Sequence, residues 1–180
     1  MELDGRLSDK EISELNDSKI AIQSVFEGMA RFYLHNQPLL RTDCPRLQLM
    51  HRIACCMEIA LDQNGAGDLY AADLIHINEQ LNIGIRGRRQ NRNLLVMDFS
   101  RTHQPDLKQL AALCGEDGTR YRIGVSIRLK QNSYRLIWQV PQNRLGLELG
   151  WYFDHCSDRA YYLEPDPSPI YAPSPKKIEW

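Results

Sequence analysis

The stretch TRYRIGVSIRLK, residues 119–130, decides the fold class. Apolar residues alternate with polar or small residues along it, and a side-chain period of two is typical of a strand with one buried face. The same alternation returns at residues 134–140 and 145–153, and residues 160–163 form a shorter candidate strand. Because short turns separate these segments, we predict an antiparallel meander over residues 119–163.

The first half of the chain has a helical rather than a strand-like pattern. Its apolar residues recur at intervals of three and four, which places them on one face of a helix. Within residues 8–82 the pattern predicts four helices, at about 8–15, 19–35, 43–63 and 69–81. A mixed segment follows at 93–115, with a buried strand at 94–99 and a short helix that ends at Gly115.

These patterns predict the domain organisation. Hydrophobic residues make up 43% of the chain and charged residues 25%, which is typical of a globular protein. We expect one α+β domain over residues 1–163, with N-terminal helices packed on a C-terminal antiparallel sheet. Residues 164–180 are rich in proline and predict an extended tail.

The sequence also bears on the cellular compartment. The N-terminus is acidic and lacks the apolar core of a secretory signal, and no apolar run approaches the roughly 18 residues that span a bilayer. The five cysteines form no CxxC pair, which favours reduced thiols over a disulfide framework. We expect a cytoplasmic protein, or one exported by a route that needs no signal peptide.

Charge is distributed unevenly along the chain. Residues 1–85 carry a net charge of −6, residues 86–144 of +8 and residues 145–180 of −3. Guanidinium groups make bidentate contacts with phosphates and carboxylates, so the basic segment predicts a surface for an anionic partner. The alternative is that the basic face docks on the acidic helices of the same chain. The candidate residues are Arg86, Arg88, Arg89 and Arg92 in a loop and Arg120, Arg122, Arg128, Lys130 and Arg135 on the sheet.

The segment DQNGAGDLYAAD, residues 62–73, is a candidate metal site. Asp62, Asn64, Gly67 and Asp73 stand at its first, third, sixth and twelfth positions. The segment resembles the calcium loop of EF-hand and dockerin proteins. This resemblance implies a helix on each side and calcium ligands at Asp62, Asn64, Asp68 (through its carbonyl) and Asp73. The fifth position is Ala66, which supplies no side-chain ligand, so a helix-capping turn is the alternative. We expect no cofactor, with calcium in this loop as the possible exception.

A third candidate site uses thiol chemistry. Cys44 precedes Pro45 at the start of a predicted helix, where the helix dipole lowers a thiol pKa. In chain order, His155 then stands as a base and Asp158, or alternatively Asp154, as the acid that orients it. The corresponding function is a thiol enzyme of the bacterial effector type.

The tail holds a candidate modification site. Residues 168–172 read Ser-Pro-Ile-Tyr-Ala. This is similar to the Glu-Pro-Ile-Tyr-Ala motif of some bacterial effectors, whose tyrosine is phosphorylated by host kinases; here Ser168 replaces the glutamate. The resemblance implies phosphorylation of Tyr171.

Together these features favour a non-enzymatic binding or adaptor protein. Its basic loop and sheet face would engage a nucleic acid or an acidic protein surface. The thiol enzyme and a calcium-dependent module are the alternatives.

Overall fold

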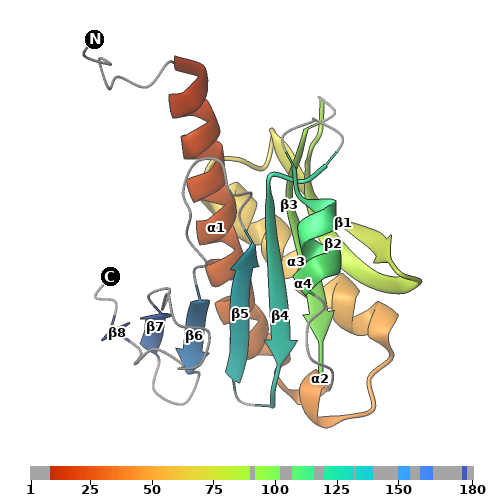
Figure 1. Ribbon diagram of the computed structural model, residues 1–180. Helices are drawn as coiled ribbons and strands as arrows, with labels where there is room; N and C mark the ends of the chain where they lie inside the picture. Colours follow the sequence, from red (N-terminus) through yellow and green to blue (C-terminus); the bar gives the residue numbers. More distant parts are fainter. Residues whose placement is uncertain are drawn as a thin grey trace.

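The computed structural model of the chain describes residues 9–89, 92–101, 107–115, 120–131, 133–139, 150–154, 159–163 and 176–177 (Figure 1). The helices are α1 (Asp9–Asn36), α2 (Pro38–Arg41), α3 (Arg46–Gln63) and α4 (Leu107–Leu113). The strands are β1 (Tyr70–Ile77), β2 (Gln80–Gly87), β3 (Asn93–Ser100), β4 (Ile123–Leu129), β5 (Ser133–Gln139), β6 (Gly150–Asp154), β7 (Arg159–Leu163) and β8 (Lys176–Lys177).

The strands form one sheet whose spatial order follows the sequence from β1 to β8. Neighbouring strands are antiparallel except for β3 and β4, which run parallel and are joined through α4. Helices α1 and α3 lie on one face of this sheet, and α4 lies on the other (Figure 1). The predicted α+β class is therefore confirmed, and the single parallel pair makes the sheet mixed.

The helix predicted at residues 69–81 is wrong, because β1 and the start of β2 occupy this segment. Tyr70, Leu74 and Ile77 are spaced as on a helix, but in the structure they belong to a strand that is largely buried on both faces. The turn between the strands is formed by Asn78 and Glu79, both with positive φ, at 45° and 64°. Two such residues are typical of a tight hairpin turn, which is usually signalled by glycine. Because neither Asn78 nor Glu79 is a glycine, the sequence did not predict the hairpin.

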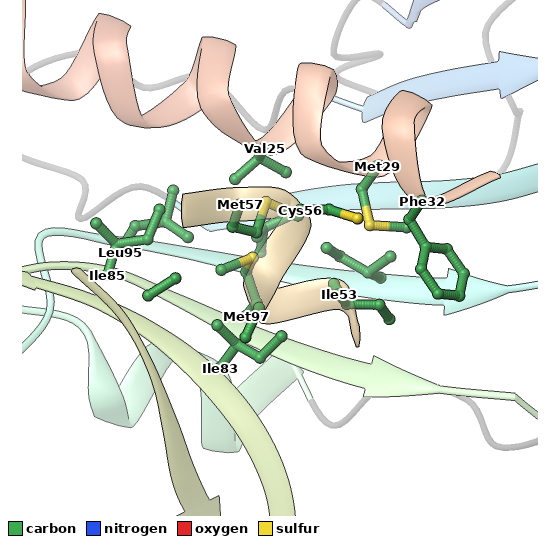
Figure 2. Packing of buried hydrophobic residues seen from close by; sticks show 14 of the residues in the cluster. Val25, Met29, Phe32, Ile53, Cys56, Met57, Ile83, Ile85, Leu95 and Met97 are labelled. Atoms are coloured by element: carbon green, nitrogen blue, oxygen red, sulfur yellow. The ribbon is translucent and has the colours of Figure 1, made fainter. Parts of the chain in front are cut away.

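The two helices predicted at residues 8–15 and 19–35 are one continuous helix, α1. It packs along α3, and both helices cover β1–β5 through a large apolar cluster (Figure 2). Val25, Met29 and Phe32 of α1 contribute to this cluster, together with Met57 of α3 and Met97 of β3. Between Ala21 and Tyr33, the apolar face of α1 is thus explained by burial in this cluster.

Strand β4 is covered on both faces, whereas the sequence predicts one buried and one solvated face. Its burial pattern is continuous except at Arg128, which is partly exposed. Helix α4 contributes Leu110 and Cys114 to a second apolar cluster, which lies on the side of the sheet away from α1. The polar and small positions of β4 lie on that same side, so α4 removes most of the water-facing surface expected there.

Two further findings complete the fold. None of the described helices is long and apolar enough to cross a membrane. Of the predicted Pro-rich tail at 164–180, only residues 176–177 are among the described ones.

Candidate anion-binding surface

Three chain segments bring arginines together at one end of the sheet. The N–H of Gly87 donates to the carbonyl of Arg92 at 2.8 Å, which closes the connection between β2 and β3. The N–H of Arg122 donates to the carbonyl of Asn93 at 3.3 Å, which places the entry to β4 beside that connection. We call this region the basic end. It comprises Arg86, Arg88, Arg89, Arg92, Arg120 and Arg122.

Arg86 is held against an aromatic ring at the basic end. Its Nε donates to the hydroxyl of Tyr121 at 2.9 Å, and its guanidinium carbon lies 5.8 Å from the centre of that ring. This geometry combines a hydrogen bond with a cation–π contact. The side chain remains exposed. Arg86 is thus fixed in position with part of its guanidinium still facing solvent.

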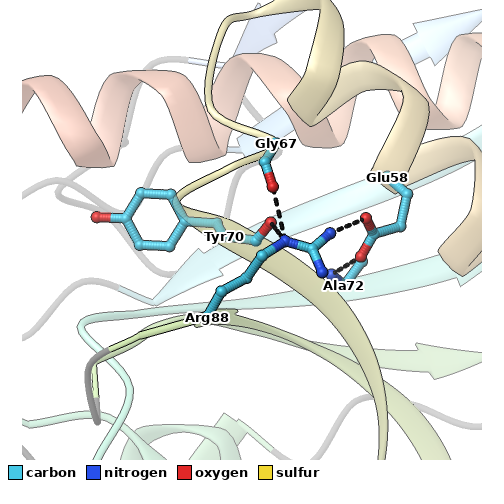
Figure 3. Close-up of polar contacts among 5 residues, drawn as sticks. All are labelled: Glu58, Gly67, Tyr70, Ala72 and Arg88. Carbon is cyan, nitrogen blue, oxygen red and sulfur yellow. Dashed lines mark hydrogen bonds and ion pairs between the residues drawn. The ribbon is translucent and has the colours of Figure 1, made fainter.

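The guanidinium of Arg88 makes its contacts with other groups of the same chain (Figure 3). Its Nε donates to the carbonyls of Gly67 and Tyr70 at 2.6 and 3.1 Å, and its Nη2 lies 2.7 Å from a carboxylate oxygen of Glu58. The other oxygen of Glu58 accepts the backbone N–H of Ala72. Arg88 therefore ties α3, the loop after it and β1 together. This supports the alternative that basic residues dock on the helices.

Arg92 also meets an acidic helix, but more loosely. Its Nη1 lies 3.9 Å from a carboxylate oxygen of Asp17 on α1, and half of its side chain is exposed (50%). Burial, and then the carboxylate of Asp17, raise the pKa of Tyr70 to about 12, so this phenol stays protonated beside the pair. Arg89 and Arg120 are exposed.

The remaining predicted cations lie at the opposite end of β4. Arg128 follows Arg122 by six positions along the chain, a distance of roughly 20 Å in a strand. Arg128 is half-buried and faces Ser100 in the ladder, and within the described part of the chain neither its Nε nor the Ser100 hydroxyl has a hydrogen-bond partner. Arg135 pairs with Arg128 across β4 and β5, and its side chain lies outside the described residues. Arg128, Lys130 and Arg135 are therefore remote from the basic end.

The structure places the predicted calcium ligands apart. Segment 70–77 is a strand, so the second helix implied by the resemblance is missing. Asn64 caps α3, and its amide donates to Glu27 and Ser24 of α1 at 2.7 and 3.3 Å. A Cβ at Gly67 would collide with the carboxylate of Asp62. Asp68 is exposed in the turn, and Asp73 is exposed on β1. Among the described residues, no group of three His, Cys, Asp or Glu side chains is arranged to hold a metal.

Of Cys44, His155 and Asp158, the residues proposed for the thiol site, the structure describes only Cys44. This residue is half-buried and precedes α3, which begins at Arg46. Its Sγ donates to the carbonyl oxygen of Pro45 at 3.6 Å. Burial raises the pKa of two other thiols, Cys56 and Cys114, that of Cys114 to about 11. His155, Asp158 and Tyr171 lie outside the described residues, so their predicted roles stay predictions.

The sequence interpretation missed Arg46, which joins two strands where their pairing ends. Its Nε donates to the carbonyl of Leu81 at 2.7 Å, and its Nη2 donates to the side chain of Asn82 and the carbonyl of Phe99 at 2.9 and 2.8 Å. Burial lowers the pKa of Arg46, and the charge of Asp98 opposes this shift. In the sequence, Arg46 is a lone arginine that follows Pro45 and belongs to no motif. Its role in bridging two strands therefore could not be predicted.

Comparisons with protein-family models, with curated proteins and with solved structures give no match. The function is therefore argued from the geometry alone.

Proposed function

We propose that this chain is a non-enzymatic binding protein that engages an anionic macromolecule through its basic end. The observation that carries the proposal is that the backbone segments bearing Arg86, Arg92 and Arg122 meet at one end of the sheet, where the N–H of Gly87 donates to Arg92 and the N–H of Arg122 donates to Asn93. Arg89 and Arg120 extend the same region and are exposed. Several guanidinium groups at one end of a rigid sheet match a partner with closely spaced negative charges, such as a nucleic acid or an acidic protein surface.

The arginines of the basic end differ in how readily they can contact a partner. Arg88 is committed to Glu58 and to two carbonyls, so a partner would gain this cation only by breaking the fold locally. Arg92 lies 3.9 Å from Asp17; half of the Arg92 side chain is exposed, whereas that of Asp17 is only 15% exposed. An incoming phosphate or carboxylate would therefore reach Arg92 from its exposed side. Arg89 and Arg92 are the proposed contact residues, and Arg120 is included with them because it is exposed at the same end of the sheet.

The test neutralises these three arginines together. We expect the variant Arg89→Gln/Arg92→Gln/Arg120→Gln to bind a labelled DNA duplex, a labelled RNA and labelled poly-glutamate more weakly than the wild type, as measured by fluorescence anisotropy over a range of salt concentrations. For DNA, removal of each arginine that binds a phosphate should flatten the plot of log affinity against log salt by about one unit. The three probes distinguish a nucleic-acid partner from an acidic protein.

The matched control is Arg52→Gln, because Arg52 is an exposed arginine on α3 that lies outside the basic end. It makes the same chemical change and should leave affinity and salt slope unchanged. Equal binding by the triple variant and the wild type would rule out the basic end. An equal loss of affinity in the Arg52→Gln variant would show that binding depends on the net charge of the protein and not on the basic end.

A further inference from the structure

A hollow lies at the end of the sheet opposite the basic end, between α2 and the connection from β4 to β5. Its volume is about 670 Å³. Leu40 and Leu129, both almost fully buried, form its apolar wall. Arg41, Arg101 and Lys130 also line it, and among the described lining residues Asp43 is the acidic one. The three cations are exposed.

The backbone acceptors around this hollow already have donors from within the protein. The hydroxyl of Thr42 donates to the carbonyl of Leu39 at 3.3 Å, and Nη2 of Arg101 donates to that of Leu40 at 2.7 Å. On the strand side, the hydroxyl of Tyr33 donates to the carbonyl of Lys130 at 2.8 Å. The amide of Gln37 donates to the carbonyl of Gln131 at 3.2 Å. These four carbonyls are thus already engaged, whereas Arg41, Arg101 and Lys130 bring cationic donors to the hollow.

The hydroxyl of Tyr33, which donates to the carbonyl of Lys130, stays protonated. This side chain is fully buried, and its ring packs against that of Tyr134 with the two centroids 5.3 Å apart. Burial raises the pKa of Tyr33 well above its ordinary value, so its hydroxyl still donates to Lys130 across the physiological range. The carbonyl of Lys130 is thereby turned inward, away from any ligand.

We infer that this hollow binds the phosphate group of a small molecule, or a free oxyanion of the same chemistry, between Arg41, Arg101 and Lys130. Three cations against one carboxylate give the lining a net positive charge. The guanidinium of Arg101 is oriented by its bond to Leu40 and has further N–H groups to donate. The hollow is open to solvent, so a small anion can reach these cations directly. This site is separate from the proposed macromolecular surface.

Two exposed residues of the hollow can be changed without breaking the contacts described above. We expect Arg41→Gln/Lys130→Gln to bind pyrophosphate and adenosine monophosphate at least about tenfold more weakly than the wild type in isothermal titration calorimetry. Asp43→Asn should bind both more tightly, because it removes the opposing charge. Tighter binding of adenosine monophosphate than of inorganic phosphate would identify a phosphorylated molecule as the ligand, and the reverse order a free oxyanion.

The controls separate this site from general electrostatics and from the basic end. Arg52→Gln should bind pyrophosphate like the wild type, and so should Arg89→Gln/Arg92→Gln/Arg120→Gln. Circular dichroism would verify that every variant is folded. No binding of pyrophosphate or adenosine monophosphate by the wild type, an equal loss of affinity with Arg52→Gln, or weaker binding by Asp43→Asn would overturn the inference. If only the basic-end variant fails to bind pyrophosphate, the anion site lies there instead.

Discussion

At the residue scale, Arg88 shows that the same guanidinium group can bind an anionic partner or hold the fold together. In the sequence it stands among Arg86, Arg89 and Arg92 and looks like a contact for an anionic partner. In the structure it contacts Glu58, the carbonyl of Gly67 in the loop before β1 and the carbonyl of Tyr70 at the start of β1. Nothing in the sequence distinguishes Arg88 from Arg89, because the acceptors come from segments some twenty to thirty residues away along the chain.

We therefore predict different effects of alanine at these two adjacent positions. Arg88→Ala should lower the free energy of unfolding by about 1–3 kcal/mol, because it leaves the carbonyls of Gly67 and Tyr70 and the carboxylate of Glu58 without this donor. Arg89→Ala should change it by less than about 0.5 kcal/mol, as is usual for an exposed site. Urea unfolding of both variants measures the difference.

A double-mutant cycle with Glu58→Gln adds a check on the mechanism. The two changes should be less than additive if Arg88 and Glu58 act on each other. Equal stability of Arg88→Ala and Arg89→Ala would show that the contacts in Figure 3 contribute nothing to the fold.

At the scale of elements, the crossing of α1 and α3 depends on one small residue. A Cβ at Gly28 would collide with Sδ of Met57 and lie 3.1 Å from its Cα, so the two helices meet more closely than a side chain at this position ordinarily allows. Because the second contact is with backbone, rotation of the Met57 side chain alone cannot relieve it. Sequence periodicity predicts both helices, but it gives no distance between them.

Gly28→Ala therefore sets two effects against each other. Alanine favours a helix over glycine by about 1 kcal/mol, whereas overpacking a tight interface costs about 1–3 kcal/mol. Since the added methyl meets backbone as well as sulfur, we expect a net loss of stability of about 1 kcal/mol in thermal or urea unfolding.

The control for this prediction is an alanine at an exposed position of the same helix. Leu34 is 69% exposed, so Leu34→Ala should be nearly neutral. A more stable Gly28→Ala would mean that α1 and α3 can move apart freely, in conflict with the packing in Figure 2.

At the scale of the whole molecule, one apolar cluster joins the helical half to the sheet. It contains residues of α1 and α3 together with residues of β1 through β5. Phe32 of α1 and Leu136 of β5, more than one hundred residues apart, are both fully buried in it. The two halves that differ in sequence pattern should therefore behave as one folding unit.

The prediction is a single cooperative transition. Phe32→Ala and Leu136→Ala should each lower the free energy of unfolding, by about 3–5 and 2–5 kcal/mol, and in each variant helical circular dichroism and aromatic fluorescence should change together. Two separate transitions, with each variant affecting only one, would divide the chain into two domains.

The sequence by itself determined the residues that alternate on β4 and β5, the helical character of α1 and α3, the short helix α4 and the α+β class. These follow from local periodicity, which a chain carries whatever its partners are. Tertiary structure decided what periodicity leaves open. The turn at Asn78 and Glu79 converts a helix-like spacing into a hairpin, and α4 covers a sheet face that the sequence assigns to water. Which arginines remain available for a partner was decided in the same way, because a guanidinium group is satisfied by acceptors that only folding brings near.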